Sequence, residues 1–206
     1  GLTGSDLGTA ERWVAGVAAA IPAGSTAYKL ISGAIADMRI AASVGGIGAD
    51  GQALMDFTKL TREQKGVVGE LLGSTTVQNA LPGATRLGRL GDAGSQGIDD
   101  LYKVSSANAD YVIVEYKFGT SPLGNTTDGL QMSDGWVAGG ERVLRAVKGD
   151  TAQADAIADA ITLGRVEKWV VHTDPAGGTS IWIVDAAGKY IKAGSDVVSK
   201  VLGAPK

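Results

Sequence analysis

The sequence predicts a mixed α/β (α+β) domain, one sheet with helices packed on it, preceded by a helical module. The order of elements from residue 59 reads helix, strand, strand, helix, helix, strand, strand, which is typical of a mixed layer architecture. A hydrophobic content of 44% with 20% charged residues is globular and allows a sizeable core. No run of 18 apolar residues occurs, so no membrane-spanning helix is expected.

The composition changes near residue 58 and divides the chain in two. Residues 1–58 hold 10 Gly and 13 Ala and few charges. Helices are predicted over 10–21 and 26–43, separated by a break that contains Pro22 and Gly24. We expect residues 1–58 to form an Ala/Gly-rich helical module, with peripheral membrane insertion as the alternative. Residues 59–206 then form the second domain.

The second domain begins with a helix whose start is marked by a capping box from Thr61 to Gln64, and which is predicted to end near Leu72. Two strands, over 98–104 and 111–118, are joined by a polar turn and predict an antiparallel hairpin. Apolar periodicity and turn signals predict the other elements: helices over 130–147, 151–163 and 196–202, and strands over 165–173, 180–185 and 189–191.

The composition also excludes several classes of site. There is no Cys, so disulfides and thiolate zinc sites are excluded, and a single histidine, His172, excludes a multi-histidine metal centre. The net charge of −3 argues against a generally basic nucleic-acid binder but leaves room for a local basic cleft. The chain starts with Gly and has no basic leader, so we expect no signal peptide and either a fragment or the released end of a larger protein.

The most informative stretch is the strand over residues 111–118, in which Glu115 and Lys117 follow an apolar run. Strand side chains alternate between faces, so these two side chains share one face. A charged pair on a buried strand is costly unless it has a use. Asp99 lies 12 residues before Tyr111, on the preceding strand. An Asp followed by Glu-x-Lys on the next strand is the spacing of a metal-dependent phosphodiesterase site.

Phosphodiester hydrolysis needs a nucleophilic water and neutralisation of a highly anionic transition state, and hard divalent cations supply both. Mg²⁺ prefers carboxylate oxygens. Asp99 and Glu115 would provide carboxylates from adjacent strands, and Glu70 a third from the packed helix. Lys117 would orient the attacking water or stabilise developing charge.

These residues match the pattern of a known family. Glu70, Gly97-Ile98-Asp99 and Glu115-Tyr116-Lys117 resemble the PD-(D/E)xK nuclease superfamily, whose fold is restriction-endonuclease-like, over roughly residues 59–192. Gln131-Met132-Ser133-Asp134-Gly135-Trp136 resembles the Gln-bearing helix of many members. Together the motifs look like nuclease toxins at the C-termini of bacterial polymorphic toxins, among them contact-dependent growth inhibition proteins. Residues 1–58 resemble, more vaguely, the translocation region that precedes the nuclease in such toxins.

The resemblance implies a role for each matched residue. Glu70, Asp99 and Glu115 would be metal ligands for Mg²⁺, with Mn²⁺ or Zn²⁺ as substitutes. Lys117 would be the catalytic lysine and Gln131 a supporting residue.

Two choices between neighbours stay open on the sequence. Asp100 competes with Asp99, because only one of two consecutive strand residues can face the site, and the Gly-Ile-Asp match favours Asp99. Glu63 competes with Glu70, because seven residues span about two turns and place both on one helix face. The Gly-x-x-Gly-Glu context favours Glu70.

The resemblance further implies a nuclease toxin that hydrolyses phosphodiester bonds in the nucleic acid of a competing bacterium, with tRNA favoured over DNA. A cognate immunity protein would block its site. The toxin would be secreted or delivered from the cell surface as part of a larger protein, pass the membrane transiently with the help of residues 1–58, and act in the target-cell cytoplasm. The contrasting hypothesis is a non-catalytic binding module in which Asp99, Glu115 and Lys117 form a structural network.

The remaining polar and aromatic residues have ordinary interpretations beside functional ones. His172 is expected to be a hydrogen-bonded histidine at a strand end. Trp136, Trp169 and Trp182 are expected in the core or at its rim, where an exposed one could stack on a base. Three cations share one helical region, either as a phosphate-binding stripe or as a solvated face: Arg142, Arg145 and Lys148.

Overall fold

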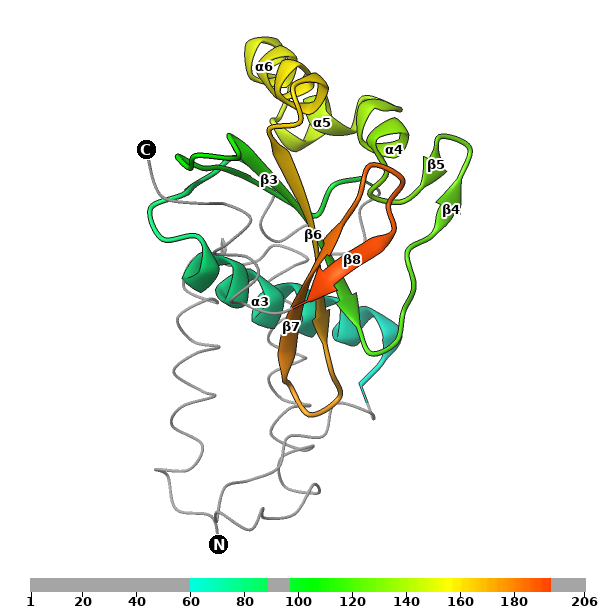
Figure 1. Cartoon of the computed structure of the whole chain (residues 1–206). Coiled ribbons are helices and arrows are strands. Elements are labelled where there is room, and N and C mark those ends of the chain that lie inside the picture. The colour runs from blue at the N-terminus through cyan, green and yellow to red at the C-terminus, as the bar shows by residue number, and fades with distance from the viewer. Residues whose placement is uncertain (1–59, 89–96, 194–206) are drawn as a thin grey trace, which may run out of the picture.

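The computed structural model describes residues 60–88 and 97–193. These residues form a six-stranded mixed sheet with helices on both faces (Figure 1). The mixed α/β class predicted from the sequence is therefore confirmed. The predicted module over 1–58 and the predicted helix over 196–202 lie outside the described residues.

The sheet has the strand order β1-β2-β3-β6-β7-β8. Its neighbours pair antiparallel except β3 and β6, which are parallel and are connected by the segment that contains the helices α4, α5 and α6. The predicted antiparallel hairpin is confirmed as β2 and β3. The strand bounds are β1 (Thr85–Arg86), β2 (Asp100–Lys103), β3 (Tyr111–Phe118), β6 (Val166–Thr173), β7 (Thr179–Val184) and β8 (Tyr190–Ala193).

The helices divide between the two faces of the sheet. Helix α3 (Arg62–Ala80) packs on one face, and α4 (Asp134–Ala138), α5 (Arg142–Ala146) and α6 (Thr151–Thr162) pack on the other. In Figure 1 the last three gather at the top of the view, beside a small two-stranded sheet of β4 (Asn125–Thr126) and β5 (Gly129–Leu130). We call the two sides the α3 face and the α4–α6 face.

Alternation along β3 creates a separate hydrophobic cluster on each face. Val112, Val114 and Tyr116 pack with residues of α3, while Tyr111 and Ile113 pack with residues of α4, α5 and α6. The odd-numbered side chains of β3, which include Glu115 and Lys117, therefore point to the α4–α6 face.

Helix α3 runs eight residues beyond the predicted end at Leu72, to Ala80. Gly73 follows Leu72 but does not end the helix. Its role is in the packing of α3 against the sheet. A Cβ added at Gly73 would lie 2.4 Å from the ring of Tyr116. The glycine thus lets α3 approach the sheet closely, and the helix ends only at the Leu81-Pro82-Gly83 segment.

The predicted helix over 130–147 is wrong. The segment contains β5, α4 and α5, and the two helices are separated at Gly139-Gly140-Glu141, where Gly140 and Glu141 both have a φ of 55°. The side chain of Arg142 stabilises this corner by donating to Asp128 Oδ2 at 2.7 Å and to the Trp136 carbonyl at 2.8 Å. Because Arg142 is engaged in these bonds, it does not belong to a free phosphate-binding stripe.

Candidate functional site

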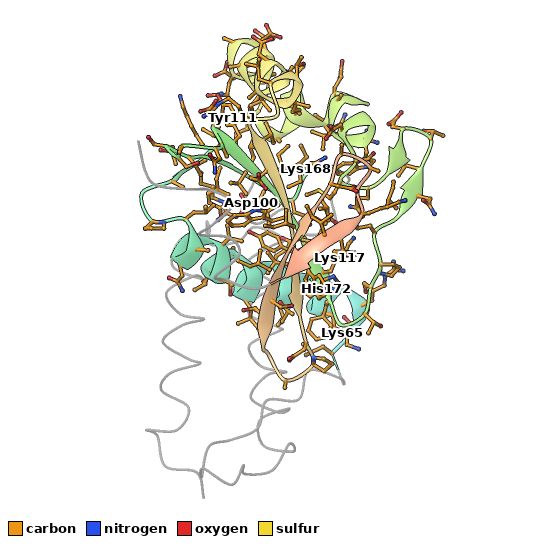
Figure 2. All side chains as sticks on the ribbon, in the orientation of Figure 1. Lys65, Asp100, Tyr111, Lys117, Lys168 and His172 are labelled. Atoms are coloured by element: carbon orange, nitrogen blue, oxygen red, sulfur yellow. The ribbon has the colours of Figure 1, made fainter. Side chains whose placement is uncertain are left out.

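The candidate site lies at the end of β3, on the α4–α6 face. Glu115 and Lys117 pair in register with Val170 and His172 of the parallel strand β6. Side chains at paired positions share a face. Figure 2 accordingly shows Lys117 and His172 close together at one end of the sheet, with Lys168 further along β6.

Glu115 is buried, with 4% of its surface exposed. Its Oε1 accepts from Lys117 Nζ at 2.8 Å. The other carboxylate oxygen, Oε2, is buried and has no hydrogen-bond partner in the part of the chain that the structure describes. A buried ionised group with an unmet acceptor is costly, so this oxygen is the most under-satisfied polar atom of the site.

Gln131 joins the pair from the loop between β5 and α4. Its Oε1 accepts from Lys117 Nζ at 3.0 Å and from the backbone N–H of Gly124 at 3.2 Å. A backbone bond from Gln131 N to the Gly124 carbonyl at 2.8 Å holds the same loop. The next residue, Met132, is fully buried with a φ of 68° and anchors the turn. Gln131 therefore holds the ammonium of Lys117 in place.

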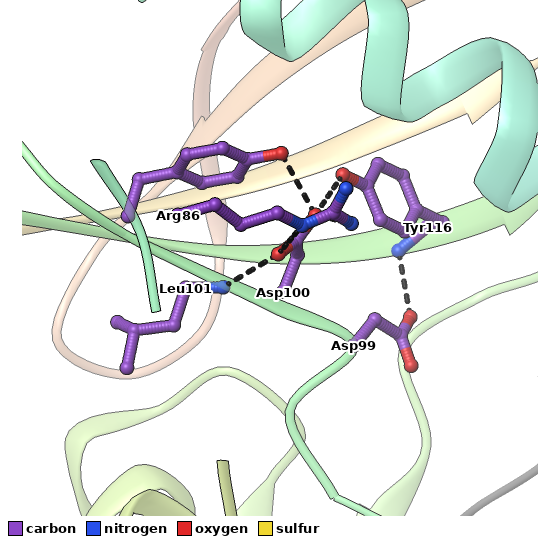
Figure 3. Close-up of polar contacts among 6 residues, drawn as sticks. Arg86, Asp99, Asp100, Leu101 and Tyr116 are labelled. Carbon is purple, nitrogen blue, oxygen red and sulfur yellow. Dashed lines mark hydrogen bonds and ion pairs between the residues drawn. The ribbon is translucent and has the colours of Figure 1, made fainter. Parts of the chain in front are cut away.

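Asp99 completes the group from the residue before β2. Its Oδ2 accepts from the backbone N–H of Tyr116 at 2.8 Å (Figure 3). Burial and then the charge of Glu115 raise the pKa of Asp99 well above its usual value, although the Tyr116 N–H and Lys117 lower it. Burial also raises the pKa of Glu115, and Lys117 opposes this. The two carboxyl groups thus interact: the charge of Glu115 disfavours ionisation of Asp99, whereas the interaction with Asp99 lowers the pKa of Glu115.

Asp100 points the opposite way, to the α3 face. Arg86 binds both of its oxygens, and the hydroxyls of Tyr102 and Tyr116 each donate to Oδ2 at 2.8 Å. Figure 3 shows this network apart from Asp99. Because Asp100 is used in a structural network, Asp99 is the aspartate that accompanies Glu115, as the Gly-Ile-Asp match favoured.

Glu70 is placed differently from the other four predicted residues. It lies on α3, which covers the other face of the sheet. The preceding residue, Gly69, packs against the Lys117–Phe118 backbone, so Glu70 is near the same end of β3 but approaches from the α3 face. Its competitor Glu63 is also on α3, and its side chain lies outside the described residues. The structure therefore brings together Asp99, Glu115, Lys117 and Gln131, which we call the β3 site.

The β3 site offers a hard divalent cation two carboxyl groups, Asp99 and Glu115. Within residues 60–88 and 97–193, no group of three or more His, Cys, Asp or Glu side chains that could hold a metal ion is found. Two neighbouring carboxylates with one unmet oxygen remain, however, and Mg²⁺ is commonly held by one or two carboxylates plus waters and substrate phosphates. A cation there would pair with Glu115 Oε2 and favour the ionised forms of the two buried carboxyl groups.

Two further residues lie in this neighbourhood, His172 and Tyr190. His172 is hydrogen-bonded at a strand end, as expected: Nδ1 lies 3.1 Å from the Gly119 carbonyl, and Nε2 lies 3.2 Å from the hydroxyl of Tyr190. Tyr190 itself was missed, because its place beside His172 depends on the pairing of β7 with β8. No local pattern in the sequence indicates that register.

Comparisons with protein-family models, with curated proteins and with solved structures gave no match to this chain. Across the described ranges, no helix has both the length and the apolar character needed to cross a membrane.

Proposed function

We propose that this protein is a metal-dependent nuclease with a restriction-endonuclease-like fold of the PD-(D/E)xK type, and that the β3 site hydrolyses phosphodiester bonds. The observation that carries the proposal is the grouping of Asp99, Glu115, Lys117 and Gln131 on one face, with a buried carboxylate oxygen that has no partner among residues 60–88 and 97–193. By contrast, the buried carboxylate of Asp100, on the other face, is bonded through both of its oxygens.

Each residue of the β3 site has a role that follows from its contacts. Asp99 and Glu115 would hold the cation, which when bound would neutralise phosphate charge and lower the pKa of a bound water. Lys117 presents an ammonium beside the carboxylates, where it orients a water and stabilises charge on the phosphate oxygens. Gln131 keeps that ammonium in position through its 3.0 Å bond. Glu70 stays a predicted third ligand, reached from α3.

The biological setting rests on the resemblance of the motifs alone. It comprises a toxin domain over 59–206, tRNA as the favoured substrate ahead of DNA, Mg²⁺ as the cation, and a cognate immunity protein that covers the site. It also comprises delivery as part of a larger protein, membrane passage aided by residues 1–58, and action in the cytoplasm of a competing bacterium.

The proposal is tested with purified full-length protein incubated with tRNA and, separately, with plasmid DNA, in Mg²⁺, in Mn²⁺ and in EDTA. Wild type should cleave at least one substrate with a divalent cation and neither in EDTA. Glu115→Gln and Lys117→Ala should lose that cleavage, whereas Lys103→Ala, an exposed lysine at the end of β2, should retain it. Absence of cleavage by wild type with both cations would contradict the proposal.

A non-catalytic binding module is favoured by one observation, the direct ion pair between Lys117 and Glu115 at 2.8 Å. Under that hypothesis the β3 site is a structural network. Wild type would then cleave neither substrate and would bind no divalent cation. Glu115→Gln and Lys117→Ala would only reduce the stability of the protein.

A further inference from the structure

Two large aromatic side chains are exposed together on the sheet. Trp182 of β7 is 37% exposed and Tyr190 of β8 is 40% exposed. Their rings pack edge to face with centroids 5.6 Å apart. The other tryptophans that the structure describes, Trp136 and Trp169, are buried in the two core clusters. The aromatic pair, Trp182 and Tyr190, therefore needs a reason that core packing does not supply.

The aromatic pair lies on the same face as the β3 site and is continuous with it. Glu115 pairs with Val170, and Val170 pairs with Trp182, so these three residues form one row across the sheet. Neighbouring strands are about 4.8 Å apart, which places Trp182 roughly 10 Å from Glu115 along that row. This distance is about the size of one nucleotide.

Tyr190 connects the aromatic pair to the neighbourhood of Lys117 through His172. Its hydroxyl lies 3.2 Å from Nε2 of His172, and His172 is the register partner of Lys117. Burial, and after it the charge of Glu115, raise the pKa of Tyr190. The charge of Glu115 thus acts on Tyr190, although strands β6 and β7 lie between the strands of the two residues.

We propose that the ring of Trp182, which Tyr190 contacts edge to face, is a stacking platform for an unpaired base of the strand being cleaved, and hence that the substrate is single-stranded or locally unpaired nucleic acid. This inference rests on the proposed function, since the β3 site would hold the phosphate of the same strand. Aromatic rings stack on bases irrespective of sequence, but in a duplex both faces of each base are already stacked. A platform one nucleotide away from the phosphate site can therefore be used only by an unpaired base.

The occupant is nucleic acid rather than a protein partner because of this continuity with the β3 site. An exposed apolar residue elsewhere offers a contrast: Leu163, after the end of α6, is 71% exposed but has no register connection to Glu115 or Lys117. Leu163→Ala is therefore a matched control for loss of exposed apolar surface.

The test uses the full chain and an RNA oligonucleotide that contains 2-aminopurine, either single-stranded or annealed to its complement. With Mg²⁺, wild type should cleave the single strand at least tenfold faster than the duplex. Trp182→Ala should raise KM for the single strand about tenfold or more with little change in kcat, Trp182→Phe should restore most of the loss, and Leu163→Ala should match wild type. In EDTA, wild type should quench 2-aminopurine fluorescence, and Trp182→Ala should not.

The outcomes separate this inference from the proposed function. Equal cleavage of single strand and duplex, with KM unchanged in Trp182→Ala, would overturn the platform and leave the nuclease standing; this is also the result expected if a protein partner occupies the pair. If wild type cleaves neither the single strand nor the duplex, the proposed nuclease function is contradicted. The fluorescence titration in EDTA then tests the stacking platform by itself. Quenching that requires Trp182 would support the platform, and absence of quenching would overturn it.

Discussion

Asp99 and Asp100 are consecutive in the chain but lie on opposite faces of the sheet in contrasting electrostatic settings. On the α3 face, Asp100 accepts hydrogen bonds from Arg86, two tyrosine hydroxyls and the Leu101 N–H. On the α4–α6 face, Asp99 accepts the Tyr116 N–H and lies beside a second carboxylate, Glu115. Burial raises the pKa of both aspartates, but Arg86 lowers that of Asp100, whereas Glu115 raises that of Asp99 further.

The contrast separates a carboxylate whose hydrogen bonds are satisfied within the fold from carboxyl groups whose bonds are only partly satisfied. A fully bonded buried network makes a fold rigid and specific. At the β3 site burial disfavours ionisation of both carboxyl groups, Lys117 offsets part of this cost, and Glu115 Oε2 has no hydrogen-bond partner among the described residues. The Asp100 network on the α3 face is thus satisfied within the protein, whereas Glu115 on the α4–α6 face keeps an oxygen that a bound cation could pair with.

The largest expected effect is on stability, from Asp100→Ala. This change leaves Arg86 and two buried tyrosine hydroxyls without their acceptor, and loss of one partner of a buried ion pair typically costs about 3–5 kcal/mol. Asp99→Ala should change the free energy of unfolding by no more than about 1 kcal/mol, because the lost hydrogen bond is offset by relief of repulsion with Glu115. Urea denaturation measures both, and an equal or larger loss for Asp99→Ala would contradict the contrast.

Next in size is the loss of cleavage in Lys117→Ala. Removal of a group that stabilises transition-state charge commonly lowers kcat by about 10²–10³-fold. The rate should be measured per folded molecule, since Glu115 loses its cationic partner in this variant. Lys103→Ala is the control, and a Lys117→Ala rate within a few-fold of wild type would remove Lys117 from the mechanism.

A smaller effect is expected at the helix position that the sequence left open. Glu70→Gln should lower cleavage about tenfold, the lower end of what supporting groups around a metal contribute. Glu63→Gln, two turns earlier on the same helix, should leave the rate unchanged. The reverse result would assign the helix carboxylate to Glu63, and two silent variants would limit the ligands to the β3 site.

The smallest effect concerns pH. A carboxyl whose pKa is raised on folding stabilises the protein below its unfolded pKa, and this stability is lost as pH rises through the folded pKa. The pKa values of Asp99 and Glu115 are both raised in the fold. Asp99→Asn should therefore gain stability relative to wild type as pH rises from about 4 toward neutrality. Chemical denaturation across this pH range in EDTA measures the free energy of unfolding of both proteins. A stability difference between Asp99→Asn and wild type that shrinks as pH rises would contradict the prediction.

Sequence reasoning could place β3 and its charged pair because both depend on local rules. An apolar β-branched run defines the strand, and the period of two places Glu115 and Lys117 on one face. The choice of Asp99 over Asp100 came from a motif match, and its physical reason, the Arg86 and tyrosine network, involves residues from three strands.

Other features could not be predicted because their causes are not local. Helix α3 continues through Gly73 only because the Tyr116 ring fills the space where a Cβ would be. The segment over 130–147 contains Met132 and Glu141 in the left-handed conformation. Neither residue is a glycine, so the sequence gives no sign that the helix is interrupted there. The aromatic pair emerges only from the register of β6, β7 and β8.

The measurement that tests the central claim most directly is calorimetric titration of the full chain with Mn²⁺ or Mg²⁺. Wild type should bind a divalent cation, Glu115→Gln and Asp99→Asn should weaken that binding by at least tenfold, and Leu163→Ala should bind as wild type does. Equal affinity in wild type and Glu115→Gln would show that the under-satisfied carboxylates of the α4–α6 face are not a cation site.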